Sequence, residues 1–228
     1  MALKKYKCPY CGKEFTKERT LQVHMCEPKR RYLQKDEKWV VNAFMVFQRF
    51  YQIHQKNSKT KTYDDFVGSP YYNAFVKFGR FIMHINPLYP DKYIDFVLKS
   101  KVKLDHWARD DLYETYLIET IKSEPVESAL QRSIATMMDW ATEQNAQWSD
   151  YFRLVNTNRA VQHIQQGKIS PWLLLGCNAG KRMLKSFSDE QLQMIERFIN
   201  PSFWPSKLKS YPADHMLVQD TAKEAKIV

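Results

Sequence analysis

The stretch YKCPYCGKEFTKERTLQVHMC, residues 6–26, decides how this chain begins to fold. Cys8 and Cys11 are separated by two residues, and His24 follows Cys11 after twelve more. Two thiolates at this spacing fit the turn of a β-hairpin, and an imidazole at this distance falls on the helix that follows the hairpin. The stretch therefore predicts a small ββα unit that is held together by a metal ion.

Further features of the same stretch make it similar to a C2H2 zinc finger. Tyr6 precedes the first cysteine by two positions, a Gly-Lys pair follows the second, and Phe15 and Leu21 occupy the two core positions. The resemblance implies Zn²⁺ as the cofactor. It also implies a structural role for the ion, because so short a unit has too few apolar side chains to fold without it.

The fourth ligand departs from the pattern of that family. A C2H2 finger carries its second His or Cys at a position equivalent to residues 28–30, which here are Pro, Lys and Arg. Cys26 lies only two positions after His24, and side chains at i and i+2 point in different directions on a regular helix. Cys26 therefore reaches the metal only if the helix ends at His24. Pro28 favours such an end, because the residue before a proline avoids the helical region.

The predicted zinc ligands are accordingly Cys8, Cys11, His24 and Cys26. The alternative is a Cys-Cys-His site completed by water or by a distant residue. A disulfide framework is disfavoured, because the chain shows no secretory signal and its remaining cysteine, Cys177, lies in an apolar run typical of a buried structural thiol.

Positive charge is concentrated beside the predicted finger. Residues 1–38 hold eleven Lys or Arg against five acids, a net +6 of the +10 carried by all 228 residues. Such a density next to a zinc module favours contact with phosphate backbones. The residues expected to contact nucleic acid are Lys13, Lys17, Arg19, Thr20, Lys29, Arg30 and Arg31. The alternative is a basic linker that only aids solubility.

The finger itself limits how DNA could be read. If Leu21 is the fourth residue of the finger helix, the three base-facing positions are Lys17, Thr20 and Val23, and Val23 offers no hydrogen-bond donor. A single finger covers about three base pairs. We therefore expect sequence-tolerant or structure-selective binding.

The rest of the chain indicates a mainly α fold, in which an all-helical part of one domain or two small subdomains follows the ββα finger. The whole chain is 44% hydrophobic and 14% aromatic and has only six glycines, and apolar side chains after the finger recur at helical spacing. The predicted organisation is 1–30 for the zinc finger, 31–62 for a basic linker and first long helix, 63–208 for the helical body and 209–228 for a flexible tail.

Capping residues and prolines predict where the individual helices begin and end. The expected helices span about 34–55, 69–82, 91–100, 105–122, 125–145, 157–166, 171–184 and 188–200.

No convincing catalytic constellation is found, so the sequence predicts a protein that is not an enzyme. Residues 176–182, GCNAGKR, look superficially like a phosphate-binding loop but lack its glycine spacing and its Ser or Thr, which argues against a nucleotide site. The acid pairs Asp110-Asp111 and Asp189-Glu190 fall at helix starts, where acids are favoured without any metal. No apolar run approaches a membrane span or a targeting core, which predicts a soluble intracellular protein of the cytoplasm without a membrane partner.

Three stretches after the first long helix resemble the helicase-loading protein of T4-type phages. They are Tyr71-Tyr72-x₂-Phe75-x-Lys77-Phe78, Trp107-x₂-Asp110-x₂-Tyr113-x₂-Tyr116-Leu117, and residues 164–174, IQQGKISPWLL. The resemblance covers about 69–208 and implies a basic, all-helical protein that binds forked DNA and recruits a replicative hexameric helicase. That family has no counterpart of the zinc finger, and no functional residue is carried over from it.

Two functions of different classes follow from these patterns. In the first, the protein is a DNA-binding accessory factor of replication or transcription, whose helical body docks a protein machine. In the second, the finger is a protein-interaction module, and the chain is an adaptor or assembly factor that never touches DNA.

Overall fold

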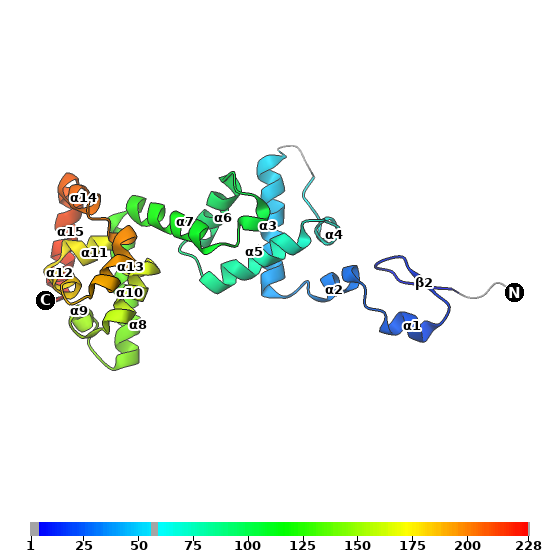
Figure 1. Ribbon diagram of the computed structural model, residues 1–228, viewed down its shortest axis with the longest axis horizontal. Helices are drawn as coiled ribbons and strands as arrows, with labels where there is room; N and C mark the ends of the chain where they lie inside the picture. Colours follow the sequence, from blue (N-terminus) through cyan, green and yellow to red (C-terminus); the bar gives the residue numbers. More distant parts are fainter. Residues whose placement is uncertain (1–4, 56–58, 228) are drawn as a thin grey trace. The chain divides into compact units, whose positions relative to one another are not determined.

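The structure is a computed structural model that describes residues 5–55 and 59–227 (Figure 1). The chain forms two compact units, Met1–Tyr113 and Glu114–Val228. A two-stranded sheet at the start is followed by helices throughout the described residues, which confirms the predicted fold class of a ββα finger and a helical remainder.

The first unit contains the finger and the helices that follow it. Its elements are β1 (Tyr6–Lys7), β2 (Glu14–Phe15), α1 (Glu18–Val23), α2 (Glu27–Leu33), α3 (Lys38–His54), α4 (Tyr63–Val67), α5 (Tyr72–Ile85), α6 (Pro90–Lys99) and the 3₁₀ helix η1 (Leu104–His106). Helix α7 (Asp110–Ser123) begins in this unit and ends in the next.

The second unit is wholly helical in the residues described. Its elements are α8 (Val126–Gln144), η2 (Trp148–Asp150), α9 (Tyr151–Leu154), α10 (Thr157–Gln165), α11 (Pro171–Gly176), α12 (Asn178–Leu184), α13 (Asp189–Ile199), α14 (Trp204–Ser210) and α15 (Pro212–Glu224).

The core of the first unit forms where α3 packs against α5. A Cβ atom on Gly79 would lie 2.3 Å from the carbonyl oxygen of Trp39, so glycine is what allows the two backbones to approach this closely. Aromatic rings fill the space beside this crossing. The Phe47 ring lies 5.1 Å from Phe66 and 5.3 Å from Phe75.

Several helices of the first unit differ from those expected. Helix α2 was not expected, and the first long helix, expected from about residue 34, begins at Lys38. Helix α4, which the sequence analysis missed, begins at a capping box in which Thr62 and Asp65 bond each other's backbone N–H groups. The helix expected from residue 105 starts instead at Asp110, after η1. Part of the polar loop expected after the first long helix, residues 56–58, lies outside the described residues.

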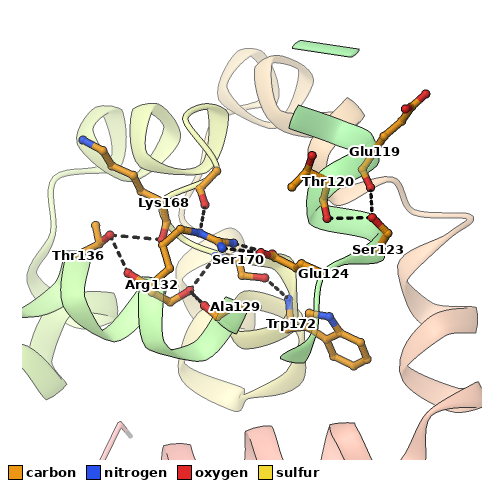
Figure 2. Close-up of polar contacts among 12 residues, drawn as sticks. Glu119, Thr120, Ser123, Glu124, Ala129, Arg132, Thr136, Lys168, Ser170 and Trp172 are labelled. Atoms are coloured by element: carbon orange, nitrogen blue, oxygen red, sulfur yellow. Dashed lines mark hydrogen bonds and ion pairs between the residues drawn. The ribbon is translucent and has the colours of Figure 1, made fainter. Parts of the chain in front are cut away.

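Polar side chains of α8 hold the turn that leads into α11 (Figure 2). Arg132 donates from Nε to the carbonyl oxygen of Gly167 at 2.6 Å, and its guanidinium pairs with the Glu124 carboxylate, whose side chain is only 2% exposed. The hydroxyl of Ser133 accepts a hydrogen bond from the backbone N–H of Ser170 at 2.9 Å. Ser170 in turn caps α11 by accepting from the N–H of Trp172. The turn is thus fixed by a paired buried charge and by satisfied caps.

The single helix expected over residues 171–184 is two helices. The chain leaves the helical region at Cys177, whose thiol accepts a hydrogen bond from the Gly180 N–H at 3.4 Å and caps α12. A Cβ on Gly180 would lie 2.2 Å from the Leu174 carbonyl oxygen, so α12 turns back tightly onto α11. Cys177 is buried, as expected for a structural thiol, and burial raises the pKa of that thiol.

The flexible tail predicted for residues 209–228 is wrong for the residues described. Helix α15 occupies most of this segment, and Val218, Ala222 and Ile227 are buried. Val218 packs on Gly176 of α11, where a Cβ would come within 2.7 Å of its side chain. The weak apolar periodicity of this segment hid a helix that tertiary contacts stabilise.

We therefore expect Val218→Ala to lower the free energy of unfolding by about 2 kcal/mol, through lost burial and the cavity left behind. The matched control is Met216→Ala on the same helix, where the side chain is 62% exposed and the cost should stay within about 0.5 kcal/mol. Urea unfolding of both variants makes the measurement. Equal stability of the two variants would mean that α15 does not pack against α11.

Candidate metal centre

The hairpin brings the first two cysteines together at its turn. Strands β1 and β2 pair antiparallel, with Tyr6 opposite Phe15. Between them, the N–H of Gly12 donates to the carbonyl oxygen of Cys8 at 2.9 Å, and Gly12 adopts φ +72°, which suits glycine. This tight turn carries the sulfur of Cys8 and that of Cys11 toward the same point.

The end of α1 supplies the other two ligands. The helix stops at Val23, and His24 adopts φ −66° and ψ 122°, an extended conformation. Cys26 is also extended, with ψ 163°, and α2 begins directly after it. The chain therefore leaves the helical conformation at His24, which is where the helix has to end if Cys26 is to reach the metal. The side chains of His24 and Cys26 converge although they are only two positions apart in the sequence.

The four side chains form one cluster with the dimensions of a zinc site. All ligand atoms of Cys8, Cys11, His24 and Cys26 lie within 4.8 Å of one another. The sulfurs of Cys8 and Cys26 are 3.9 Å apart, and the Cys11 sulfur lies 3.3 Å from Nε2 of His24. Tetrahedral zinc with bonds of about 2.0–2.3 Å separates its ligands by roughly 3.5–3.8 Å. The cluster is thus positioned to bind a zinc ion.

The surroundings shift the pKa values of the two hairpin cysteines in opposite directions. Burial raises the pKa of Cys8, but hydrogen bonds from the backbone N–H groups of Cys11 and Tyr10 and from the side chains of Cys11 and Cys26 lower it, and the net pKa is lowered. For Cys11, the backbone N–H of Lys13 lowers the pKa, while burial and the neighbouring sulfurs leave it raised overall. Crowded sulfurs of this kind resist joint ionisation unless a cation balances them.

A small apolar core supports the cluster. The Phe15 ring lies 4.8 Å from the imidazole of His24, and this contact holds the imidazole beside the hairpin. The finger also contacts the following helices of its unit, because the Tyr10 ring lies 5.4 Å from Tyr32 of α2 and Tyr32 lies 5.7 Å from Tyr63 of α4.

Comparison with known families agrees with this geometry. Residues 6–27 match the model of the family "Zinc finger, C2H2 type". The N-terminal module is therefore a zinc finger, and its Cys₂-His-Cys ligand set differs from the family name at the fourth position. Comparison of the whole chain with curated proteins and with solved structures found no significant match.

The base-facing positions expected from the sequence lie on the surface of the finger. Helix α1 begins at Glu18, so Lys17, Thr20 and Val23 fall at positions −1, 3 and 6 of the helix, and all three are exposed. Arg19 is exposed as well. The register expected from Leu21 therefore agrees with the helix start.

The remaining cations divide into free and engaged side chains. Lys13 is exposed with its Nζ 5.7 Å from the Phe15 ring centroid, and Arg30 is exposed on α2. Lys29 is half-buried and donates from Nζ to the carbonyl oxygen of His24 at 3.1 Å, which ties α2 to the finger. Lys29 thus helps to fix the chain next to the metal cluster.

Arg31 differs most from its expected role as an exposed phosphate contact. Its guanidinium donates to the Glu27 carboxylate and to the carbonyl oxygen of Val67, and it lies 4.3 Å from the centroid of the Tyr72 ring. Its side chain is 16% exposed. Arg31 therefore joins α2 to α4 and α5. The spacing of Glu27 and Arg31, i and i+4 on one helix, was the sequence signal for this engagement.

The described residues contain no second cluster of three or more His, Cys, Asp or Glu with metal-binding geometry. The acid pairs considered in the sequence begin helices, Asp110 and Asp111 in α7 and Asp189 and Glu190 in α13. No described helix is long and apolar enough to cross a membrane.

Proposed function

We propose that this protein is a non-enzymatic, DNA-binding accessory factor of replication or transcription, in which the finger and its basic flank hold the DNA backbone. C2H2 zinc fingers bind nucleic acids or proteins in general. The observation that carries the choice of DNA is that Lys17 and Arg19 extend exposed from the finger helix, while Arg30 lies exposed four residues after the ligand Cys26.

The expected binding is tolerant of sequence. Phosphate contacts by Lys and Arg carry no base information, and a lone finger reads about three base pairs. Val23 occupies one of the base-facing positions and has no donor. Selectivity would then come from the shape of the DNA, such as a fork or a junction, rather than from an operator sequence.

The helical body is proposed to dock a protein machine, with a replicative hexameric helicase as the specific candidate. What supports this candidate is the resemblance of the stretches on α5, α7 and α10–α11 to the helicase-loading protein of T4-type phages. A pull-down from the native host with the full chain identifies the partner, and recovery of a hexameric helicase is the expected result.

The salt dependence of DNA binding tests the proposal. Each phosphate contact contributes about 0.9 to the slope of log K against log salt. We expect Lys17→Glu with Arg19→Glu to flatten the slope by about 1.8 and to weaken binding on the order of 50-fold at 0.1 M salt. The measurement is fluorescence anisotropy with duplex and forked DNA between 50 and 200 mM salt.

The matched control reverses two exposed cations elsewhere in the same unit, Lys101→Glu with Lys103→Glu, which changes the net charge equally. It should lower affinity only slightly, because remote surface charges are screened. If the wild type shows no salt-dependent binding, or if the finger variant binds like this control, the proposed role of the finger in DNA binding is wrong.

A second candidate, the protein-interaction adaptor, is favoured by apolar side chains exposed near the metal centre. Val23 is 75% exposed, Met25 and Leu33 are also exposed, and all three lie on or next to the finger. Apolar side chains of this kind are common in protein interfaces. Val23→Ser with Leu33→Ser would weaken partner capture and leave the salt slope unchanged if the adaptor role holds.

A further inference from the structure

A cleft in the first unit lies between α2, directly after the finger, and α5 of the helical body. Its volume is about 440 Å³. The charged residues that line it are Glu27, Arg30, Arg31, Lys77 and Arg80. Four of these five are cations, two from each helix. More than forty residues of sequence separate Lys77 and Arg80 from Arg30, so only the folded unit places them beside the basic N-terminus.

The charges of this cleft do not cancel internally. Glu27 is the one acidic residue among the described residues that line the cleft, and its carboxylate already pairs with Arg31. Arg31 itself is turned inward to the carbonyl oxygen of Val67. This leaves Arg30, Lys77 and Arg80, which are exposed and form no ion pair within the described residues. Three uncompensated cations therefore face one cleft.

Helix α5 presents Lys77 and Arg80 within a row of exposed polar side chains. Asn73, Lys77, Arg80 and His84 are spaced at i, i+4, i+7 and i+11, so they share one helix face, and all four are exposed. The helix, YNAFVKFGRFIMHI, contains no acid. The guanidinium carbon of Arg80 lies 5.5 Å from the centroid of the Trp39 ring, a contact that limits the freedom of the guanidinium.

The two walls of the cleft are held in place by contacts other than these cations. Tyr63 of α4 donates from its hydroxyl to the carbonyl oxygen of Arg31 at 2.8 Å, and the Arg31 guanidinium lies over Tyr72 of α5. Because α2 begins at the residue after the ligand Cys26, the cleft also starts within one helical turn of the metal centre. The helices that carry the cations are therefore already in place before a ligand binds.

We infer that this cleft binds the phosphodiester backbone of a nucleic acid, through Arg30 on α2 and Lys77 and Arg80 on α5. The inference rests on the proposed function and extends it from the finger onto the helical body. Along α5, Asn73 and His84 are about 16 Å apart at about 1.5 Å per residue. This length spans about five nucleotides of one strand at about 3.4 Å each.

A backbone is favoured over a single small anion by the arrangement of these groups. The polar side chains of α5 form an extended row along the helix rather than a ring around one point. Lys and Arg neutralise successive phosphates independently, and such contacts add in the salt dependence. The finger and the cleft would then contact the same nucleic acid, since α2 both follows the finger and lines the cleft.

The test is the variant Lys77→Glu with Arg80→Glu in the full chain. Both side chains are exposed, so the fold should survive, and an unchanged thermal transition and zinc content verify it. We expect affinity for a 20-nucleotide single strand and for forked DNA to fall at least tenfold at 0.1 M salt. The salt slope should decrease by about 1.4 for the single strand and by about 1.8 for the fork duplex. The Lys101→Glu with Lys103→Glu protein is the control of equal charge.

The outcomes separate this inference from the proposed function. If the wild type binds DNA with a steep salt slope and the cleft variant binds as tightly as its control, the cleft is not a nucleic-acid site, whereas the finger remains one. If the wild type binds no nucleic acid but binds polyglutamate with an affinity that Lys77→Glu with Arg80→Glu removes, the cleft takes an acidic protein segment. That result overturns both proposals.

Discussion

Replacement of Cys8 and Cys11 by serine is expected to remove zinc from the protein and to unfold residues 6–26, while the helices that follow stay folded. Serine hydroxyls do not replace thiolates as zinc ligands, and zinc binding to such sites carries an apparent free energy of about 10–16 kcal/mol. The finger has only a small apolar core around Phe15 to resist this loss. Native mass spectrometry should find one zinc per chain in the wild type and none in the variant.

Hydrogen exchange locates the unfolded part. Amides of β1, β2 and α1 should lose their protection in the serine variant, whereas amides in the middle of α3 and α8 should keep theirs. The contacts of Tyr10 with Tyr32 and of Lys29 with His24 are the described links that the finger loses. Retention of one zinc by the variant would show that the cluster is not the metal site.

Single substitutions identify the fourth ligand. Cys26→Ala should weaken zinc binding by orders of magnitude, because it removes a thiolate whose sulfur lies 3.9 Å from that of Cys8. Cys177→Ala is the matched control, since that thiol is buried in the second unit and caps α12. Competition with a chromogenic chelator gives both affinities. Equal affinities would restore the alternative of a three-ligand site completed by water.

The second large effect is expected in the second unit, at the ion pair of Glu124 and Arg132 (Figure 2). Arg132→Met should destabilise the unit by about 3–5 kcal/mol, because it removes the cation that pairs with a carboxylate of 2% exposure. It also frees the carbonyl oxygen of Gly167 at the turn before α11. Urea unfolding followed by tryptophan fluorescence measures the loss.

Two further variants separate charge burial from side-chain loss. Glu124→Leu combined with Arg132→Met removes both charges and should recover most of the stability. The surface pair of Asp150 and Arg153 provides a control, because Arg153→Met should cost less than about 1 kcal/mol where the arginine side chain is 66% exposed. A cost for Arg132→Met as small as that of Arg153→Met would contradict the structural role of the buried pair.

The metal centre was predictable from the sequence because its ligands depend on local geometry. Cys8 and Cys11 share one hairpin turn, and α1 ends at His24 as expected, although Glu27, the residue before Pro28, is itself helical and Pro28 lies in the first turn of α2. Ligand identity and spacing are covalent properties, so a short window of sequence determines them. The mainly α fold was predictable for a similar reason, since helical periodicity and caps such as Ser188 with Gln191 are also local.

The roles of individual cations were decided only by tertiary structure. Arg30 and Arg31 are neighbours in the sequence, yet Arg30 is exposed and Arg31 bonds the carbonyl oxygen of Val67, 36 residues later. This difference depends on which face of α2 packs against the body. The positions of α4 and α5 decide which face that is. The gathering of Lys77 and Arg80 beside Arg30 likewise exists only after α5 has packed against the rest of its unit.

The same physical reason explains the elements that sequence reasoning missed. Helix α15 has little amphipathic pattern of its own, but Val218 packs onto Gly176, and burial stabilises a helix that propensity alone leaves marginal. The break at Cys177 depends on the close approach of Gly180 to the Leu174 carbonyl oxygen. The sequence by itself determined the zinc ligands and the helical class, because these rest on spacing within a few turns of chain. Packing between distant segments decided which charges stay free and which helices persist, because burial and desolvation exist only in the folded units.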